Sequence, residues 1–285
     1  MRVRKFLIIT ADDFGLHESI NESVERASRS GVLTAASLMV AGPAAADAVR
    51  RAQSLPDLRV GLHLVLADGP AMLAPEGRIN GRMFSNGCRY FALPGVRRQL
   101  EREIRAQFAA FARTGLPLDH VNAHKHFHLH PTILEFALRV GRDYGVSAIR
   151  VPDEPLWFAA QGRHWYSGSG NLLLKPWIFA MRARLRAAGM FQNDAIFGVG
   201  ASGAMDEQRL LEILVRLPAG VTEIYLHPAM ALGHAITPSM ADYRHADEFA
   251  ALMSWRVRAA LSAANVSCGG YSDAQREFGG YARTA

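Results

Sequence analysis

The chain has 285 residues, 49% of them hydrophobic, and a formal net charge of +6. This length allows a large buried core, and no apolar run reaches the ~18 residues that a membrane-spanning helix requires. The two cysteines, Cys88 and Cys268, form neither a CxxC motif nor a disulfide framework. Because the first residues lead directly into a strand pattern with no secretory leader, we expect a cytoplasmic protein.

The positive charge is carried almost wholly by arginine, since Lys5, Lys125 and Lys175 are the only lysines. A basic balance suggests nucleic acid, an anionic membrane surface or an acidic substrate as partner, although an ordinary arginine-rich surface explains it equally well. The arginines are dispersed on no recognisable module, so we expect no nucleic-acid binding. Residues 155–193 contain no acidic residue but many bulky apolar ones. This segment is the local candidate for peripheral membrane contact.

Hydrophobic periodicity in the first 95 residues predicts three strands separated by two helices. The first strand, KFLIITADD, is a β-branched apolar run that stops at two aspartates. A Gly- and Pro-rich stretch after the third strand predicts a long loop. In chain order, the expected strand, helix, strand, helix, strand and loop cover residues 5–13, 18–29, 33–40, 43–51, 59–66 and 67–95.

The rest of the chain continues the alternation. The helix expected at 96–114 places Leu100, Ile104, Phe108 and Phe111 on one apolar stripe. Further helices are expected at 132–145, 206–217 and 248–264. Further strands are expected at 119–126, 148–152, 195–199, 222–228 and 266–271.

Eight strands that alternate with helices favour parallel pairing with right-handed crossovers. The expected fold class is therefore α/β, as a TIM-like (β/α) barrel that is either regular or distorted and incomplete. It fits better than an open doubly wound sheet, because no GxGxxG turn follows the first strand. We expect one domain over residues 1–285, with insertions at about 67–95 and 153–193.

Polar side chains stand where the expected strands end, which is where such barrels build their active sites. An unpaired buried carboxylate costs several kcal/mol, so one shared cause is more economical than separate exceptions. These strand-end residues are Asp12, Asp13, His63, His124, His126, Arg150 and His227.

A divalent cation provides that shared cause. Asp13, His63 and His124 come from three strands and can converge on one metal ion with a position left open for water, as in catalytic sites. Zinc or magnesium is favoured, and manganese, cobalt or nickel would fit the same ligands. Asp12, left free, can accept a proton from the water. Taken singly, each residue also has a structural interpretation, such as an aspartate in a turn or a packed histidine.

The order ADDFG, GVLTAASLM, GLHL, AHKHFHLHP and a late LHP resembles the YdjC-like deacetylase family, which includes the chitooligosaccharide deacetylases. The likeness runs from residue 10 to about residue 273. It implies hydrolysis of an N-acetyl group from an amino sugar, at a divalent metal in a barrel-like fold.

The resemblance also implies residue roles. It places the metal ligands of the family on Asp13, His63 and His124, and its general base on Asp12. Ala123 and Lys125 stand where the family more usually has Ser and His, which affects the surroundings of the third ligand rather than the ligand itself.

Two further residues would take part in such a hydrolysis. Arg150 would orient Asp12 and keep it ionised, and His227 would protonate the leaving amine, with His126 as the alternative acid.

Three segments narrow the likeness within the family: VLADGPAMLAP after GLHL, NAHKHFHLHP, and the aromatic stretch from Trp157 to Trp177. They resemble the hopanoid-biosynthesis-associated deacetylases. This implies a lipid-linked substrate, N-acetylglucosamine on a bacteriohopane polyol, met at the inner membrane face through residues 155–193. A chitooligosaccharide or another amino sugar is the alternative substrate, and an ordinary helical insertion is the alternative role of the segment.

Other classes of protein also stay open. Phosphoester and cyclic-amide hydrolases use similar barrels, but these usually begin with HxH on the first strand, where this chain has two aspartates. A non-catalytic metal- or lipid-binding protein would bind more than one metal ion per chain and release no acetate. The sequence leaves the oligomeric state open.

Overall fold

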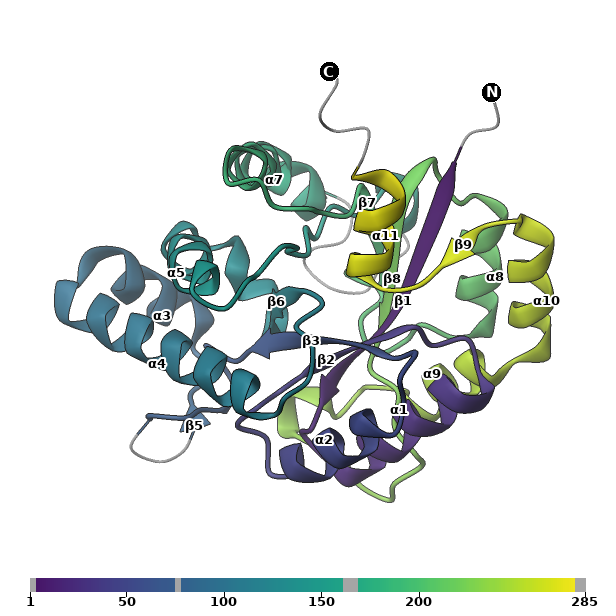
Figure 1. Cartoon of the computed structure of the whole chain (residues 1–285), viewed down its shortest axis with the longest axis horizontal. Coiled ribbons are helices and arrows are strands. Elements are labelled where there is room, and N and C mark those ends of the chain that lie inside the picture. The colour runs from purple at the N-terminus through teal and green to yellow at the C-terminus, as the bar shows by residue number, and fades with distance from the viewer. Residues whose placement is uncertain (1–3, 75–77, 161–168, 280–285) are drawn as a thin grey trace.

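The centre of the molecule is a parallel sheet that curls on itself, with helices packed around its outside (Figure 1). The computed structural model describes residues 4–74, 78–160 and 169–279, without the side chains of 169–171. The strands follow the order β6-β3-β2-β1-β8-β7, and β9 also pairs with β1. Their bounds are β1 Lys5–Phe14, β2 Ala35–Leu38, β3 Arg59–Leu64, β6 Val121–Ala123, β7 Ala195–Phe197, β8 Gly220–Leu226 and β9 Ser267–Cys268.

Irregular backbone extends the hydrogen-bond ladder between β6 and β7. The nitrogen of Arg150 donates to Val121 at 3.1 Å, and that of Ile149 donates to Phe191 at 3.0 Å. The expected strand at 148–152 is reduced to isolated bridges, because the side chain of Asn193 bonds to both the N–H and the carbonyl of Val151. The fold is therefore a distorted (β/α) barrel, which confirms the predicted fold class.

Amphipathic helices pack their apolar faces against the sheet. The stripe predicted at 96–114 is buried in α4, and Pro131 begins α5 at a position where proline is favourable. The helices are α1 Glu18–Ser30, α2 Ala45–Gln53, α3 Met83–Ala92, α4 Pro94–Arg113, α5 Pro131–Arg142, α6 Leu156–Ala159, α7 Ser169–Ala187, α8 Glu207–Val215, α9 His245–Met253, α10 Trp255–Ala264 and α11 Tyr271–Phe278. Short 3₁₀ helices are η1 His124–Leu129 and η2 Pro238–Met240.

Three more expected elements differ from the structure outside the candidate site. The helix expected at 248–264 is interrupted at Ser254, whose hydroxyl caps α10 by accepting from the nitrogens of Arg256 and Val257. The expected loop 67–95 contains α3 and the small hairpin of β4 Gly69–Pro70 and β5 Arg78–Ile79. The strand expected at 266–271 is shortened to β9, because α11 begins at Tyr271.

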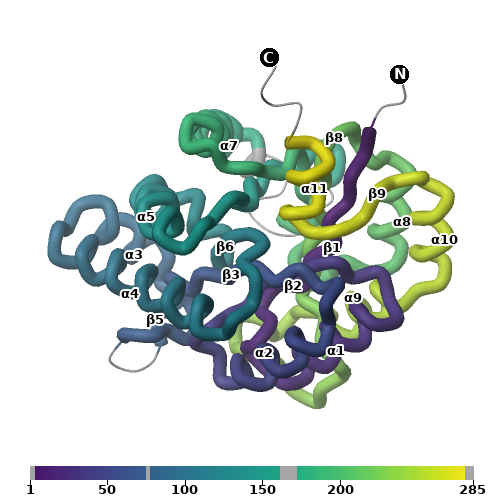
Figure 2. Tube along the Cα trace, viewed as in Figure 1, coloured from purple at the N-terminus to yellow at the C-terminus, as the bar shows by residue number. Residues whose placement is uncertain are grey.

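The expected insertion at 153–193 contains the helices α6 and α7, and residues 161–168 lie outside the described part. In Figure 2 the trace of α7 runs beside α5, on the side of the molecule away from α8 and α10. Within the described residues, no helix is both long enough and apolar enough to cross a membrane.

Candidate active site

The end of β1 brings two adjacent carboxylates to the same site. Strand residues normally alternate between faces, but the pairing of β1 with β2 shifts register between Ala11 and Phe14, and Asp13 has a φ of 62°. This left-handed conformation is strained for a residue with a side chain, and aspartate is among the residues that tolerate it best. Asp12 and Asp13 are both buried.

Asp13, His63 and His124 form a group that could hold a metal ion. One ligand atom from each lies within 4.8 Å of the others. Asp13 Oδ1 is 3.2 Å from His63 Nε2 and 3.1 Å from His124 Nδ1. The structure thus brings together the three residues that the sequence singles out as ligands, from the ends of β1, β3 and β6.

Hydrogen bonds around His63 orient its free nitrogen toward Asp13. The Nδ1–H of His63 donates to Asn122 Oδ1 at 2.7 Å, which leaves Nε2 with a lone pair. His63 Nε2 and Asp13 Oδ2 are buried atoms with no hydrogen-bond partner in the described structure. Since buried polar atoms are nearly always satisfied, two adjacent exceptions, both metal-ligand atoms by type, fit a divalent cation.

Asp12 is held by a guanidinium. Arg150 donates from Nη1 to Asp12 Oδ2 at 2.5 Å and from Nη2 to Oδ1 at 2.9 Å, and Asn122 Nδ2 donates to Oδ1 at 3.2 Å. Burial opposes ionisation of Asp12, but the charge of Arg150 outweighs it and holds the pKa of this carboxyl well below its usual range. Among the described residues, Asp12 Oδ1 has two donors and Oδ2 has one, which leaves a lone pair on Oδ2.

The four alternating histidines of NAHKHFHLHP have four different environments. His124 contacts Asp13, and His126 Nε2 lies 2.9 Å from the hydroxyl of Tyr225 on β8. His128 Nε2 lies 2.9 Å from the carbonyl of Arg150, and His130 caps α5 by accepting from the nitrogen of Thr132. Their separation comes from η1, where Lys125 and His126 have φ values of 55° and 53°. The expected strand at 119–126 therefore ends at Ala123, and His126 is not part of the ligand group.

Lys125 forms an ion pair with Asp68. It thereby ties the loop after β3 to the turn that carries His124.

His227, at the end of β8, lies on another side of Asp13. Its Nε2 is 3.9 Å from Asp13 Oδ2, and its ring packs against the ring of Tyr243 with centroids 5.0 Å apart. His245 Nδ1 bonds to the carbonyl of His227, so this histidine is held from its backbone as well. A cavity of about 410 Å³ adjoins Tyr243 and His245.

Two residues that sequence reasoning missed complete the site. Asn122 touches both His63 and Asp12, and Glu223 binds the Nε–Nη2 edge of Arg150, next to the Nη1–Nη2 edge that binds Asp12. Glu223 lies in the middle of β8 rather than at its end and is fully buried. A charged residue inside the otherwise apolar stretch TEIYL was the available signal, because buried carboxylates need partners.

The chain belongs to the YdjC-like protein family, whose family model matches residues 6–263. This confirms the family that the motifs indicate. A carbohydrate deacetylase from Brevibacillus brevis is 39% identical over 153 residues, which are 51% of this chain and 59% of that protein. Another carbohydrate deacetylase, from Thermoanaerobacter pseudethanolicus, is 24% identical over 234 residues, covering 79% of this chain and 81% of that protein.

A solved structure shows the same fold. The crystal structure of a candidate cellobiose-phosphate cleavage protein from Enterococcus faecalis V583 has a TM-score of 0.70 and 22% identity, covering 95% of this chain and 98% of that one. The chain spans 59–61% of the length of three curated relatives, from Brevibacillus brevis, Geobacillus stearothermophilus and Oceanobacillus iheyensis.

Proposed function

We propose that this protein is a metal-dependent carbohydrate N-deacetylase, which hydrolyses the acetamide of an amino sugar and releases acetate. The observation that carries the proposal is the group of Asp13, His63 and His124 with a second carboxylate at its side, Asp12, which is not part of the group and is bound by Arg150. The names of the curated relatives support the same class of reaction.

Asp13, His63 and His124 would hold the ion, with zinc or magnesium favoured. When bound, a divalent cation supplies Lewis acidity to the amide carbonyl and to a water molecule. Asp12 would accept the proton of that water through Oδ2, which retains a lone pair. Arg150 and Asn122 hold Asp12 by three hydrogen bonds, so the acceptor is oriented before substrate arrives.

His227 would protonate the leaving amine. It contacts Asp13, whereas the alternative acid, His126, is bonded to Tyr225. The leaving group of an O-acetyl substrate is an alcohol, which needs less help from a general acid than the amine that leaves an N-acetyl substrate. His227→Ala should therefore lower turnover of an N-acetyl sugar much more than turnover of an O-acetyl sugar. Equal losses on both would transfer the role to His126.

The finer part of the proposal is the substrate, N-acetylglucosamine linked to a hopanoid lipid and met at a membrane surface. Support comes from α7, whose outward side chains include Leu172, Leu173, Trp177 and Phe179, exposed by 45–81%. Exposed apolar side chains gathered on one helix, beside arginines and without acidic residues, are typical of helices that lie on membrane surfaces.

The deciding experiment incubates the metal-loaded protein with N-acetylglucosaminyl hopanoid and, separately, with diacetylchitobiose, and measures released acetate. Faster release from the lipid would support the whole proposal. Acetate release from diacetylchitobiose alone would support the deacetylase activity and reject the lipid-linked substrate. If neither substrate releases acetate and the chain binds more than one metal ion, the protein is a metal-binding protein rather than an enzyme.

A further inference from the structure

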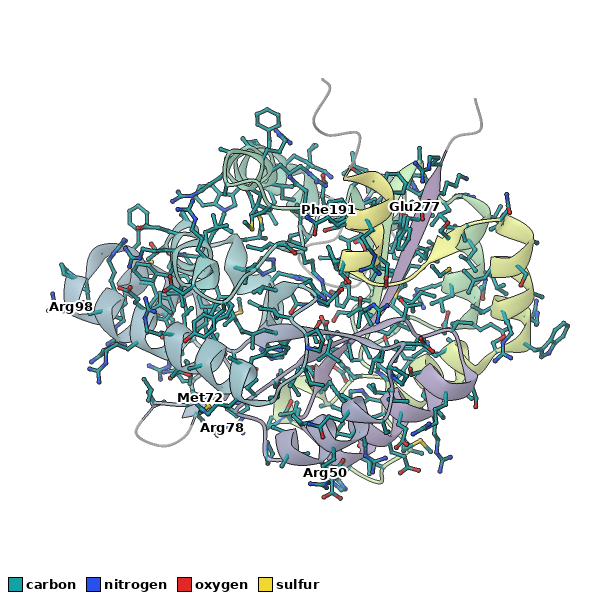
Figure 3. The ribbon with its side chains drawn as sticks, in the orientation of Figure 1. Arg50, Met72, Arg78, Arg98, Phe191 and Glu277 are labelled. Carbon is teal, nitrogen blue, oxygen red and sulfur yellow. The ribbon has the colours of Figure 1, made fainter. Side chains whose placement is uncertain are left out.

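The last helix, α11, covers the end of the barrel opposite the candidate active site. It packs where the strands begin, and Arg59 at the start of β3 donates to Asp273 of α11 at 2.9 Å. Figure 3 labels Glu277 on this helix and Phe191 beside it. Tyr271, its first residue, is fully buried, and the ring of His120 lies 4.8 Å from its own ring. Tyr271 also lies beyond residues 6–263, the part of the chain that the family model matches.

One chain of hydrogen bonds runs from the hydroxyl of Tyr271 to Asp12. The hydroxyl donates to Glu223 Oε2 at 2.5 Å. Arg150 donates to Glu223 from Nε, to Oε2 at 2.9 Å, and from Nη2, to Oε1 at 2.8 Å. Arg150 also donates from Nη1 to Asp12 Oδ2. Thr10 Oγ1 donates to Glu223 Oε1 at 2.6 Å. Glu223 therefore accepts from two sides while it orients the guanidinium.

A second chain of hydrogen bonds runs from the backbone of α11 to the same carboxylate. The nitrogens of Tyr271 and Ser272 donate to Asp119 at 3.0 and 2.9 Å. Asp119 accepts from His120 Nδ1 at 2.9 Å, and the other ring nitrogen of His120 lies 3.1 Å from Ser37 Oγ.

Ser37 passes this chain on to Asn122. Asn122 donates from Nδ2 to Ser37 Oγ at 2.8 Å and to Asp12 Oδ1 at 3.2 Å, while its Oδ1 accepts from His63. All hydrogens in this chain can be assigned with neutral imidazoles, so each donor has one acceptor. Gly61 makes room for the His120 ring, which a Cβ at that position would approach to 2.5 Å.

We propose that Tyr271 is a positioning residue for the hydrolytic site. Through Glu223 and Arg150 it sets the orientation of Asp12, and the backbone of α11 fixes the same carboxylate by way of Asn122. The two chains meet at Asp12 and start from one helix end, so they form a closed ring of buried polar groups. A closed ring restricts each member from two sides, which a single chain cannot do. This inference rests on the proposed function for its kinetic consequence only.

The test compares Tyr271→Phe with wild type. The substitution keeps the ring against His120 but removes the donor to Glu223. With the metal-loaded protein and diacetylchitobiose, we expect kcat to fall by on the order of tenfold to a hundredfold while KM and metal stoichiometry stay within about twofold. Thr10→Val removes the other hydroxyl donor to Glu223 and should cause a smaller loss of the same kind. If Tyr271→Phe does not fold, Thr10→Val tests whether the hydroxyl donors to Glu223 control kcat.

A second measurement needs no substrate. The Nε–H of Arg150 is buried and bonded to Glu223, so its NMR resonance should persist at neutral pH and exchange slowly with water. Tyr271→Phe should shift this resonance and speed its exchange. If the wild type hydrolyses no substrate, the proposed function fails, and this resonance still decides whether Tyr271 controls Arg150.

Tyr144→Phe is the matched control, because Tyr144 stacks on Phe108 outside the ring of polar groups. It should alter neither kcat nor the Arg150 resonance. The inference is overturned if Tyr271→Phe leaves kcat and the resonance unchanged. A joint loss of metal, thermal stability and activity would also overturn it, since that pattern indicates a structural role alone.

Discussion

The strand ends and the outer face of α7 differ in which side chains they bury: charged groups are buried at the strand ends, and apolar groups are exposed on α7. At the strand ends, Arg150 is completely buried and makes four hydrogen bonds to two carboxylates. On α7, Leu173 is 81% exposed and Phe179 is 69% exposed. One region removes charge from water, and the other leaves apolar surface in water.

Because of this difference, substitutions in the first region should affect folding and chemistry, and substitutions in the second should affect binding. Removing one partner of a buried charged network leaves the others unpaired, which costs several kcal/mol and alters the chemistry. An exposed apolar side chain contributes little to folding, so its replacement changes mainly what the surface can bind. Substitutions in the two regions should therefore affect different measurements.

The largest effect is expected from the three ligand residues. Asp13→Ala, His63→Ala and His124→Ala should each lower metal affinity by more than about 100-fold, the upper effect of losing an outer partner of a ligand, and turnover should fall with it. Metal content after dialysis, measured by mass spectrometry, checks this. His234→Ala, at an exposed histidine, is the control and should keep its metal. If one of these three variants keeps one metal ion per chain, the residue that it replaces is not a ligand.

Asp12→Asn should separate metal binding from catalysis. The ligand group is untouched, so metal stays bound, but the proton acceptor is gone and kcat should fall about 10²–10⁴-fold. Steady-state kinetics and metal content on the same sample check both halves. Asp57→Asn makes the same chemical change at an exposed position and should have no effect. Normal turnover by Asp12→Asn would remove Asp12 from the mechanism.

The candidate ligand group could be picked out from sequence because its signal is local. Barrel strands favour apolar residues, so Asp13, His63 and His124 at strand ends stand out without knowledge of the fold. The surroundings of the site gave weaker signals. Asn122 resembles any polar strand residue, and its role as acceptor for His63 depends on β3 and β6 lying side by side.

The fold was predicted where periodicity is strong and missed where distant side chains decide it. The strand expected at 148–152 forms only bridges because Asn193, about forty residues later, occupies the backbone groups of Val151. The first residues of α11 bond to Asp119, 152 positions before Tyr271. No local window contains both partners of such a contact.

Asp119 should show a smaller effect, on stability. Burial raises the pKa of this carboxyl, but the bond from His120 and those from α11 outweigh burial and lower the pKa to about 2. Because the folded pKa lies below the unfolded one, ionised Asp119 stabilises the fold above about pH 4, and this contribution is lost as pH falls toward 2.

Asp119→Asn should thus lower the free energy of unfolding by about 2 kcal/mol at pH 7 and by about half as much near pH 3. Urea denaturation at both pH values measures the difference, with Asp57→Asn again as the control. An equal loss at both pH values would mean that packing, rather than charge, accounts for the role of Asp119.

The face of α7 should show the smallest effect, one on binding alone. Wild-type protein should sediment with phosphatidylcholine vesicles that contain phosphatidylglycerol, and less with vesicles of phosphatidylcholine alone. Leu173→Glu with Phe179→Glu removes apolar contact and adds two charges that an anionic surface repels by about 1 kcal/mol each. The vesicle partition coefficient should fall by at least about tenfold, with turnover of diacetylchitobiose unchanged.

Val215→Glu with Trp255→Glu is the matched control for this pair. Both side chains are apolar and similarly exposed, at 84% and 77%, but they lie on α8 and α10, across the molecule from α7 (Figure 2). If both pairs reduce sedimentation equally, net charge rather than the α7 face controls binding. If the α7 pair instead abolishes a dimer that light scattering detects in the wild type, the exposed apolar residues serve self-association, and the peripheral membrane contact is rejected.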